Sequence, residues 1–358
     1  MSRFWSKAAQ RCEPYVPGEQ LNQPEIIKLN TNENPYPPSP NVVRAIEKEA
    51  ANKLNLYPSP TVDQLKKRIA DLNNLKSEQV FVGNGSDEVL AFSFMAFFDQ
   101  DKPIRFPDIS YSFYSVYARL FNIPHESVAL KEDFTIPKEA FFQSSGGVIF
   151  PNPNAPTSIY LGLDEIKEIA EQNPDQVVII DEAYIDFASV SAVSLIQDYE
   201  NVLIIQTMSK SKSLAGLRVG YALGDADLIS GLIRIKDSFN SYTLDRLAIA
   251  GAEAAIQAID YYADITEKII TTREWTIAEM NKRGFTVLPS QTNFIFATHS
   301  TLPAELLYQK LKDRGILIRY FNKPRIENYV RITIGTDGEM EQLFLLLDQI
   351  AKEASFTS

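Results

Sequence analysis

Short runs of consecutive apolar residues recur through the first two thirds of the chain, with amphipathic stretches between them. The apolar runs are the strand candidates and occupy residues 79–82, 103–106, 147–150, 177–180 and 202–205. Strands that are apolar at consecutive positions are typical of a sheet buried on both faces. The stretches between them have the period of helices and occupy residues 61–72, 86–98, 163–172 and 226–236. This alternation predicts an α/β fold with a mostly parallel, doubly wound sheet.

The two ends of the chain depart from this alternation. The beginning is rich in proline (Pro14, Pro17, Pro24, Pro35, Pro37, Pro38 and Pro40), which predicts an extended arm rather than a packed element, anchored by residues 26–29. Residues 243–282 have a helical period and predict a bridge between two domains. Four strands and two helices are predicted beyond it, at 285–288, 293–297, 316–319 and 329–334, and at 303–314 and 338–351. We therefore expect an arm over residues 1–40, a large domain over 41–260 and a smaller α+β domain over 261–358.

Composition and charge narrow the classes of function. Of the 358 residues, 45% are hydrophobic and 23% are charged, the balance of a soluble globular protein. The net charge of -11 disfavours nucleic acid and anionic membranes as partners, and no apolar run is long enough to cross a bilayer. The first residues lack the apolar stretch of a signal peptide, so we expect a cytoplasmic protein. With Cys12 as the only cysteine, and His125 and His299 as the only histidines, we expect no disulfide, no metal site and no Ser-His-Asp mechanism.

The first candidate site follows the first apolar run, where open α/β sheets place their ligands. Gly83, Gly85, Ser86 and Asp87 lie there, at the junction with a predicted helix. Glycines let the backbone approach a ligand, and the free N–H groups of a first helical turn bind phosphate. A plain helix cap explains Ser86 and Asp87 equally well.

Acidic and basic residues follow two later runs. Asp181 comes directly after the fourth run, with Tyr184 three residues further on. Its carboxylate either caps the next helix or keeps a pyridine nitrogen protonated, which makes the ring an electron sink. Lys210 and Lys212 follow the fifth run, with Arg218 close behind. Solvated surface lysines explain this pattern, and so does a Schiff-base site with an arginine that binds a phosphate.

Two arginines, Arg319 and Arg331, end or interrupt late strands. Arginines on strands are most often edge residues with solvated guanidinium groups. Their functional interpretation is that they bind an anionic group of a substrate.

Taken in order, these patterns resemble the fold-type I pyridoxal-phosphate aminotransferases. The most specific stretch is residues 29–40 (LNTNENPYPPSP), which resembles the N-terminal signature of the histidinol-phosphate aminotransferase subfamily. Residues 330–336 (VRITIGT) resemble that subfamily as well, and the resemblance extends over residues 15–347. It implies the family's α/β large domain with a smaller C-terminal domain, and pyridoxal phosphate as the cofactor.

The resemblance also implies how each candidate residue meets the cofactor. Lys210 is the Schiff-base lysine, because it stands eight residues before Arg218 as the family requires, and Lys212 is structural. Four residues hold the cofactor phosphate through backbone or side chain: Ser86, Asp87, Ser209 and Arg218. Tyr111 stacks on the cofactor ring, Asp181 contacts the pyridine nitrogen and Tyr184 contacts the ring hydroxyl. Tyr57 reaches the cofactor phosphate of a neighbouring subunit, which implies a homodimer with shared active sites.

For the substrate, the resemblance implies that Arg319 and Arg331 bind its distal phosphate and related anionic groups. Tyr15 is expected to assist from the arm. Arg325, which lies between the two arginines, is expected to add to a phosphate contact or to replace one.

The loop at residues 152–158 departs from the family pattern. Ala155 stands where the family has an asparagine that contacts the ring hydroxyl, and Ser158 stands in place of a glycine. We expect either that Asn154 serves instead, or that Tyr184 holds the hydroxyl alone.

The implied activity is transamination of histidinol phosphate in histidine biosynthesis, with glutamate and 2-oxoglutarate as the second substrate pair. Lys210 would move the proton at the reacting carbon while Asp181 keeps the ring nitrogen protonated. An aromatic amino-acid aminotransferase and a threonine-phosphate decarboxylase remain alternatives, since both need the same lysine. A binding module without chemistry is a third alternative, which the presence of Lys210 and the lack of a DNA-binding domain disfavour.

Overall fold

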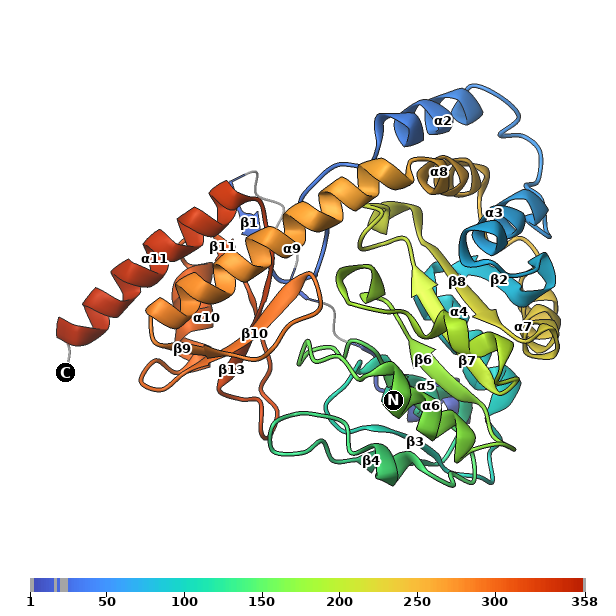
Figure 1. Ribbon diagram of the computed structural model, residues 1–358, viewed down its shortest axis with the longest axis horizontal. Helices are drawn as coiled ribbons and strands as arrows, with labels where there is room; N and C mark the ends of the chain where they lie inside the picture. The colour runs from blue at the N-terminus through green and yellow to red at the C-terminus, as the bar shows by residue number, and fades with distance from the viewer. Residues whose placement is uncertain (1–2, 16–17, 20–24, 357–358) are drawn as a thin grey trace.

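A seven-stranded sheet forms the larger part of the computed structural model in Figure 1, within residues 3–15, 18–19 and 25–356, which the structure describes. Its strands are β2 (Val80–Asn84), β3 (Ile104–Pro107), β4 (His125–Val128), β5 (Val148–Pro151), β6 (Val178–Asp181), β7 (Val202–Thr207) and β8 (Val219–Gly224). They lie in the order β2-β8-β7-β6-β5-β3-β4, and β8 alone runs antiparallel to both of its neighbours in the described sheet. The predicted α/β class with a mostly parallel sheet is confirmed.

Helices cover both faces of this sheet, and its central strands β6 and β7 each begin with consecutive apolar residues, all of them buried. In β6, Val178 and Ile180 join one buried cluster and Ile179 joins the other, as alternate side chains of a strand must. The first cluster includes residues of α2 (Pro40–Ala50), α3 (Asp63–Asn73), α6 (Leu163–Glu171) and α8 (Arg246–Gln257). The second includes residues of α4 (Gly85–Phe97), α5 (Phe113–Phe121) and α7 (Ala226–Phe239).

A smaller layer lies to the left in Figure 1 and has its own buried cluster. Its antiparallel sheet has the order β12-β13-β10-β9 and comprises β9 (Phe285–Val287), β10 (Phe294–His299), β12 (Arg319–Tyr320) and β13 (Tyr329–Thr333). The helices of this layer are α9 (Ile259–Lys282), α10 (Ala304–Lys312) and α11 (Asp337–Phe356). Figure 1 shows α9 running from α8, beside the large sheet, across to the small one. The predicted domain limits at residues 40/41 and 260/261 stay predictions.

The arm joins the small layer through strand pairing. β1 (Ile27–Lys28) pairs in parallel with β11 (Ile316–Leu317), and the backbone N–H of Leu29 donates to the Leu317 carbonyl at 2.7 Å. This is the anchor that the apolar residues of 26–29 predict. The arm is not extended throughout, because α1 (Lys7–Arg11) is helical and the Arg11 side chain donates to the Arg119 carbonyl at 3.0 Å.

Three further differences from the sequence-based expectation have physical reasons. β4 was not predicted, since its sequence HESV is polar and its first three residues are exposed. β8 was not predicted either, because Gly220 and Gly224 interrupt its apolar pattern. The helical stretch at 243–282 is two helices, α8 and α9, which meet at Ala258. Within the described residues no helix has the length and apolar character needed to span a membrane.

Candidate active site

The predicted cofactor residues meet at one edge of the large sheet. Asp181 is the last residue of β6, Asn154 follows β5 and Lys210 follows β7, and the carboxyl ends of these parallel strands share an edge. β2 runs in the same direction, because β8 is antiparallel to both β2 and β7. The first turn of α4, with Ser86 and Asp87, therefore opens onto the same edge.

Two glycines make room for close backbone contacts at the start of α4. Gly85 has φ +78°, and a Cβ there would lie 2.4 Å from Arg218 Nη2. A Cβ on Gly220 would lie 2.3 Å from the Ser86 backbone nitrogen. Only glycine permits both approaches. Arg218 and the N–H groups of the first helical turn consequently converge on one small volume, an arrangement suited to a phosphate.

Side chains complete this anion-binding turn. Arg218 Nη2 donates to Asp87 Oδ2 at 2.9 Å, and the Tyr111 hydroxyl donates to Asp87 Oδ1 at 2.7 Å. Burial and the Asp87 charge raise the pKa of Tyr111 well above its usual value. Ser209 is buried, and its Oγ accepts from the Thr207 hydroxyl at 3.0 Å. The Asp87 carboxylate thus holds both Arg218 and Tyr111 next to the first turn of α4, of which Asp87 is part.

Asp181 is a buried acid, with 4% of its surface exposed. The Tyr114 hydroxyl donates to its Oδ2 at 2.9 Å, and the Ala183 N–H donates to its Oδ1 at 3.3 Å. Burial raises the pKa of Asp181 to about 6, and the bond from Tyr114 opposes that rise. An ionised carboxylate in such a place favours a cationic partner, as a protonated ring nitrogen would be.

The neighbouring Glu182 is buried as well but faces a different set of donors. Its carboxylate accepts from the Ser191 hydroxyl at 2.6 Å, the Ala192 N–H at 2.7 Å and Gln206 Nε2 at 2.8 Å. Burial raises the pKa of Glu182 to about 7. Its bonds fix the turn after β6 rather than reach the ligand edge.

The arm residues of the LNTNENPYPPSP segment surround Lys210. Lys210 Nζ donates to the Thr31 carbonyl at 3.3 Å and lies 5.6 Å from the centroid of the Tyr184 ring. Asn34 Nδ2 donates to the Lys210 carbonyl at 3.0 Å, and Asn32 Nδ2 donates to the Tyr184 hydroxyl at 2.8 Å. The arm therefore positions both the lysine and the tyrosine that follow β7 and β6.

Lys212 faces a different environment from Lys210. Its Nζ lies 3.3 Å from Asp186 Oδ2 and 5.7 Å from the centroid of the Tyr262 ring. These contacts hold the loop after β7 in place, while the structural role of Lys212 stays a prediction.

In the divergent loop, Asn154 is buried and Ala155 supplies no polar side chain. Asn154 Nδ2 donates to the Ile109 carbonyl at 2.9 Å and to Thr157 Oγ1 at 2.8 Å. Its Oδ1 is buried and has no hydrogen-bond partner within the described structure. A buried polar atom without a partner is rare and suits a site that a ligand completes. Asn154 is thus present at the ligand edge, while its contact with a ring hydroxyl stays a prediction.

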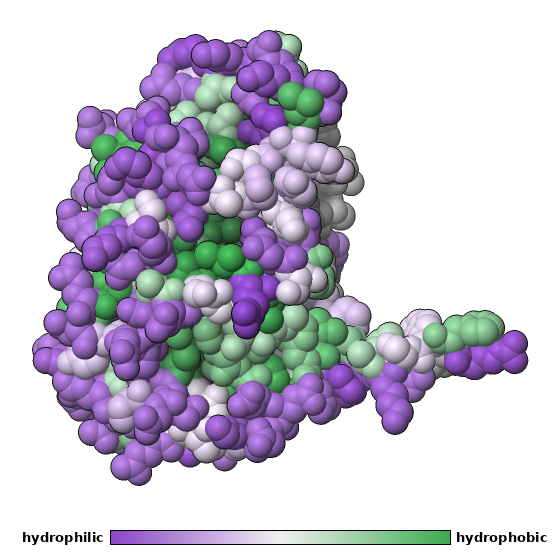
Figure 2. Space-filling view, turned by 90° about the vertical axis from the view of Figure 1, so that its right-hand side faces the viewer, coloured by the Kyte–Doolittle hydropathy of each residue, from purple (hydrophilic) through white to green (hydrophobic). Residues whose placement is uncertain are grey.

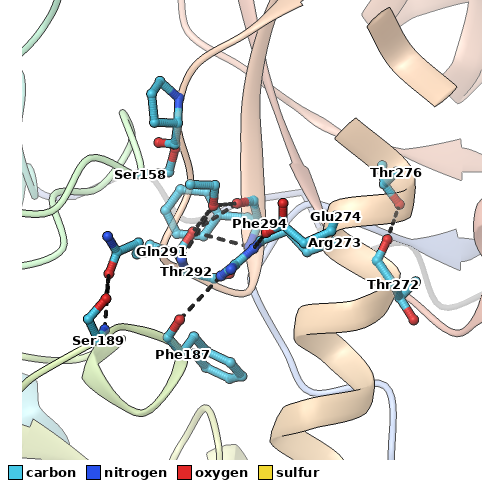
Figure 3. Close-up of polar contacts among 12 residues, drawn as sticks. Ser158, Phe187, Ser189, Thr272, Arg273, Glu274, Thr276, Gln291, Thr292 and Phe294 are labelled. Carbon is cyan, nitrogen blue, oxygen red and sulfur yellow. Dashed lines mark hydrogen bonds and ion pairs between the residues drawn. The ribbon is translucent and has the colours of Figure 1, made fainter. Parts of the chain in front are cut away.

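Figure 3 shows how Ser158 ties this loop to the small layer. Ser158 adopts φ +67°, its hydroxyl donates to the Pro289 carbonyl at 3.1 Å, and its own carbonyl accepts from the Gln291 N–H at 3.1 Å. Arg273 of α9 is buried, and its Nη1 donates to the carbonyls of Phe187 and Thr292 at 3.2 and 3.0 Å. The segment after Tyr184, the loop before β10 and α9 are therefore joined by buried polar contacts.

Two of the three late arginines lie together. Arg319 and Arg331 are opposite each other in the β12–β13 pair, and Arg331 Nη2 donates to the Asn30 carbonyl at 3.0 Å. Burial lowers the pKa of Arg331, and the charge of Arg319 lowers it further, while Tyr15 has a smaller opposite effect. The centroid of the Tyr15 ring lies 4.6 Å from that of the Phe113 ring, at the start of α5.

Arg325 is not part of this pair. Its Nη1 donates to Asp108 Oδ2 at 3.2 Å, and its Nη2 donates to the carbonyls of Leu130 and Lys131 at 2.9 and 2.8 Å. The guanidinium thus binds the large layer rather than the neighbourhood of Arg331. The expected phosphate contact of Arg325 gains no support from these bonds.

Tyr57 is the one predicted cofactor residue that lies outside the cluster. Its side chain is 78% exposed, and its ring stacks on Tyr242 at 4.7 Å. Exposure on its own subunit is what a residue that serves a neighbouring site requires.

Sequence reasoning missed Tyr114 and the asparagines of the arm. Tyr114 donates to Asp181 from 67 residues away, and no local pattern marks such a pair. Asn32 and Asn34 belong to the segment 29–40, whose resemblance to the family signature implies no role for these side chains. Several asparagines close together beside prolines could have indicated buried side-chain contacts, since buried amides need hydrogen-bond partners.

Comparison with known proteins agrees with this geometry. A family model described as aminotransferase class I and II matches residues 24–346. Histidinol-phosphate aminotransferase 1 of Oceanobacillus iheyensis is 58% identical over 352 residues, covering 98% of this chain and 99% of that protein. Histidinol-phosphate aminotransferase of Clostridium acetobutylicum is 57% identical over 342 residues, covering 96% of this chain and 97% of that protein. The crystal structure of histidinol-phosphate aminotransferase from Sinorhizobium meliloti in complex with pyridoxal-5'-phosphate covers 99% of both chains with a TM-score of 0.89, and at 24% identity it supports the fold.

Proposed function

This chain belongs to the class I and II aminotransferases, and we propose that it transfers the amino group of histidinol phosphate to 2-oxoglutarate with pyridoxal phosphate as cofactor. The observation that carries the substrate is a pair of consecutive carbonyls in the arm. Asn30 O accepts from Arg331, and Thr31 O accepts from Lys210. Adjacent carbonyls of the arm thus bind a guanidinium that can bind an anion and a reactive amine. A short substrate with an amine at one end and a phosphate at the other requires two such groups close together.

The residues at the sheet edge fit pyridoxal phosphate. Its phosphate suits the turn where Gly85 and Gly220 leave no room for a Cβ and Arg218 closes the side. Its ring nitrogen suits Asp181, and the buried Asn154 Oδ1 without a partner marks a polar position beside the ring. When bound, the cofactor supplies an aldehyde that exchanges amines and a ring that takes up the electron pair from the substrate carbon.

Each side chain of the site then has a defined task. Lys210 Nζ is the primary amine that binds the cofactor, and it carries the proton at the reacting carbon. Asp181, ionised above its pKa of about 6, holds the proton at the ring nitrogen. The Tyr184 hydroxyl, which accepts from Asn32 of the arm, would bind the ring hydroxyl of the cofactor. The arm holds Lys210 through the Thr31 carbonyl and the Asn34 side chain.

We further propose a homodimer in which Tyr57 completes the partner's site. Leu54, Leu56, Tyr57 and Phe239 are 60%, 54%, 78% and 73% exposed. Figure 2 shows the right-hand side of Figure 1, where apolar residues gather within a polar surround. Large exposed apolar patches mark interaction surfaces. The cytoplasm is our proposal for where the enzyme works, since its single cysteine, Cys12, is free.

A steady-state comparison of three amino donors tests the proposed activity. With 2-oxoglutarate present, histidinol phosphate should react with a much higher kcat/KM than phenylalanine. Threonine phosphate should release no carbon dioxide. A preference for phenylalanine would favour an aromatic aminotransferase, and decarboxylation of threonine phosphate would favour the lyase, so either result would overturn the proposal.

A further inference from the structure

Arg319 and Arg331 face each other across the β12–β13 pair, an arrangement that costs stability for like charges. Arg331 Nη2 donates to the Asn30 carbonyl, but its Nε is buried without a hydrogen-bond partner within the described residues. A buried donor without a partner also costs stability unless a ligand binds it. The Asn30 carbonyl binds Nη2 alone, so the rest of this guanidinium needs a second contact that holds it before an anion arrives.

Aromatic rings lie against both guanidinium groups. The guanidinium carbons of Arg319 and Arg331 lie 5.5 and 5.6 Å from the centroid of the same ring, that of Phe321. Arg331 also lies 5.2 Å from the centroid of the Phe294 ring. Both distances to Phe321 are within the range of cation–π attraction. One half-buried side chain, directly after β12, is therefore shared by both cations.

A ring and a carboxylate beside a guanidinium differ in how many of its N–H groups remain available to a ligand. A carboxylate would neutralise the guanidinium and use its N–H groups, which form the bidentate bonds to oxyanions. A ring attracts the cation through its face and leaves those N–H groups available. The unpartnered Nε of Arg331 is the direct sign of this difference.

We propose that Phe321 is a positioning residue for oxyanion recognition, which holds Arg319 and Arg331 side by side for the substrate's phosphate. The identity of the anion rests on the proposed function, whereas the role of the ring does not. Phe321 touches neither the reacting carbon nor Lys210 in this scheme, and its effect passes through the two arginines.

The test replaces Phe321 in the holoenzyme by a residue without a ring and by one that keeps it. Phe321→Leu should raise KM for histidinol phosphate by about three- to thirtyfold with kcat unchanged, because ground-state and transition-state binding are lost together. Histidinol, the same compound without phosphate, should keep its kcat/KM within about twofold, since no oxyanion is bound. Inorganic phosphate, as a competitive inhibitor, should weaken by the same factor as histidinol phosphate. Phe321→Tyr, which keeps the ring, should restore both values.

Phe134 offers a matched control, because its ring lies 5.5 Å from the guanidinium carbon of Arg325. That arginine is already bonded to Asp108, so Phe134→Leu should leave phosphate inhibition unchanged in protein that thermal denaturation shows to be folded. Equal losses in Phe321→Leu and Phe321→Tyr, equal losses for both substrates, or unchanged phosphate inhibition in Phe321→Leu would overturn the inference. A wild-type enzyme that does not distinguish histidinol phosphate from histidinol would overturn the proposed function instead, while the inhibition by inorganic phosphate would still decide the role of Phe321.

Discussion

Removing the hydroxyl of Tyr114 tests how Asp181 is kept ionised for a cationic partner. Tyr114→Phe deletes the 2.9 Å bond to Asp181 Oδ2 and leaves the ring in place. Tyr114 has no exposed surface and Asp181 is 4% exposed, so solvent has little access to replace the lost donor. The substitution therefore isolates one hydrogen bond in a buried site.

The magnitude follows from the charge on the acceptor. A hydrogen bond to a charged group is worth roughly 1.5–3 kcal/mol, and one pKa unit corresponds to about 1.4 kcal/mol. The bond favours the ionised form, so its loss raises the pKa of Asp181, which is about 6 in the wild type. We expect a rise of about one to two units, to roughly 7–8.

The consequence is a cofactor affinity that depends on pH. At pH 6.5 the wild-type carboxylate is mostly ionised, whereas the variant must first lose a proton to bind the ring nitrogen. The dissociation constant for pyridoxal phosphate should rise about tenfold there, and the difference should vanish above about pH 9, where both carboxylates are ionised.

Fluorescence titration of the apoenzyme with pyridoxal phosphate between pH 6.5 and 9 measures this directly. Tyr117→Phe is the matched control, since its hydroxyl donates to the Asp87 carbonyl at 2.9 Å from the same helix. Its effect on affinity should be the same across this pH range. A ratio of dissociation constants that stays constant with pH in Tyr114→Phe would refute the reasoning.

Four further outcomes are expected. Lys210→Ala should abolish transamination but keep pyridoxal phosphate binding detectable, while Lys212→Ala should remain active; activity measurements showing the reverse would mean that the wrong lysine was chosen. Mixing inactive Lys210→Ala with Tyr57→Phe subunits should raise activity above the average of the parents, and no rise after confirmed subunit exchange would contradict a shared site. Burial raises the pKa of Glu182 to about 7, so its stabilising effect is complete below about pH 4.5 and is lost as the pH rises through 7. The free energy of unfolding of Glu182→Gln, measured in urea, should therefore rise by up to about 3 kcal/mol relative to that of the wild type over this interval, and a difference that stays constant with pH would contradict this. Arg331→Gln should lower kcat/KM for histidinol phosphate by about tenfold to a hundredfold with little change for histidinol, and equal losses would exclude a phosphate contact.

The fold was accessible from the sequence wherever a strand is apolar at consecutive positions. β6 and β7 lie between two layers of helices, so every residue of both strands is buried, and their apolar runs identify them. β4 lies at the sheet edge with exposed polar residues, and its pattern is that of a loop. The limit is physical, because an edge strand is specified by its partner β3 more than by its own side chains.

Part of the site could also be predicted from the sequence, because several of its residues lie at the ends of these strands. Asp181 ends a strand, and Lys210 and Ser86 follow strands, so the rule that ligands bind at the carboxyl edge of a sheet places them together. Tyr114 and Asn32 contact this group from other elements, and their side chains are assigned only by tertiary packing. Motifs thus locate the residues that meet the ligand, while the residues that orient them need the folded chain.

The register of the β12–β13 pair separates the three late arginines. The family resemblance singles out Arg319 and Arg331, but spacing alone gives no reason to prefer any pair of the three arginines within these thirteen residues. Once two of the stretches are taken as antiparallel strands, however, residues directly opposite each other must point to the same face. Arg319 and Arg331 are such a pair, whereas Arg325 lies in the connecting loop with φ +71° and its side chain reaches Asp108 of the large layer. The register of a hairpin, rather than the number of basic residues in it, therefore decides which cations can bind one anion together.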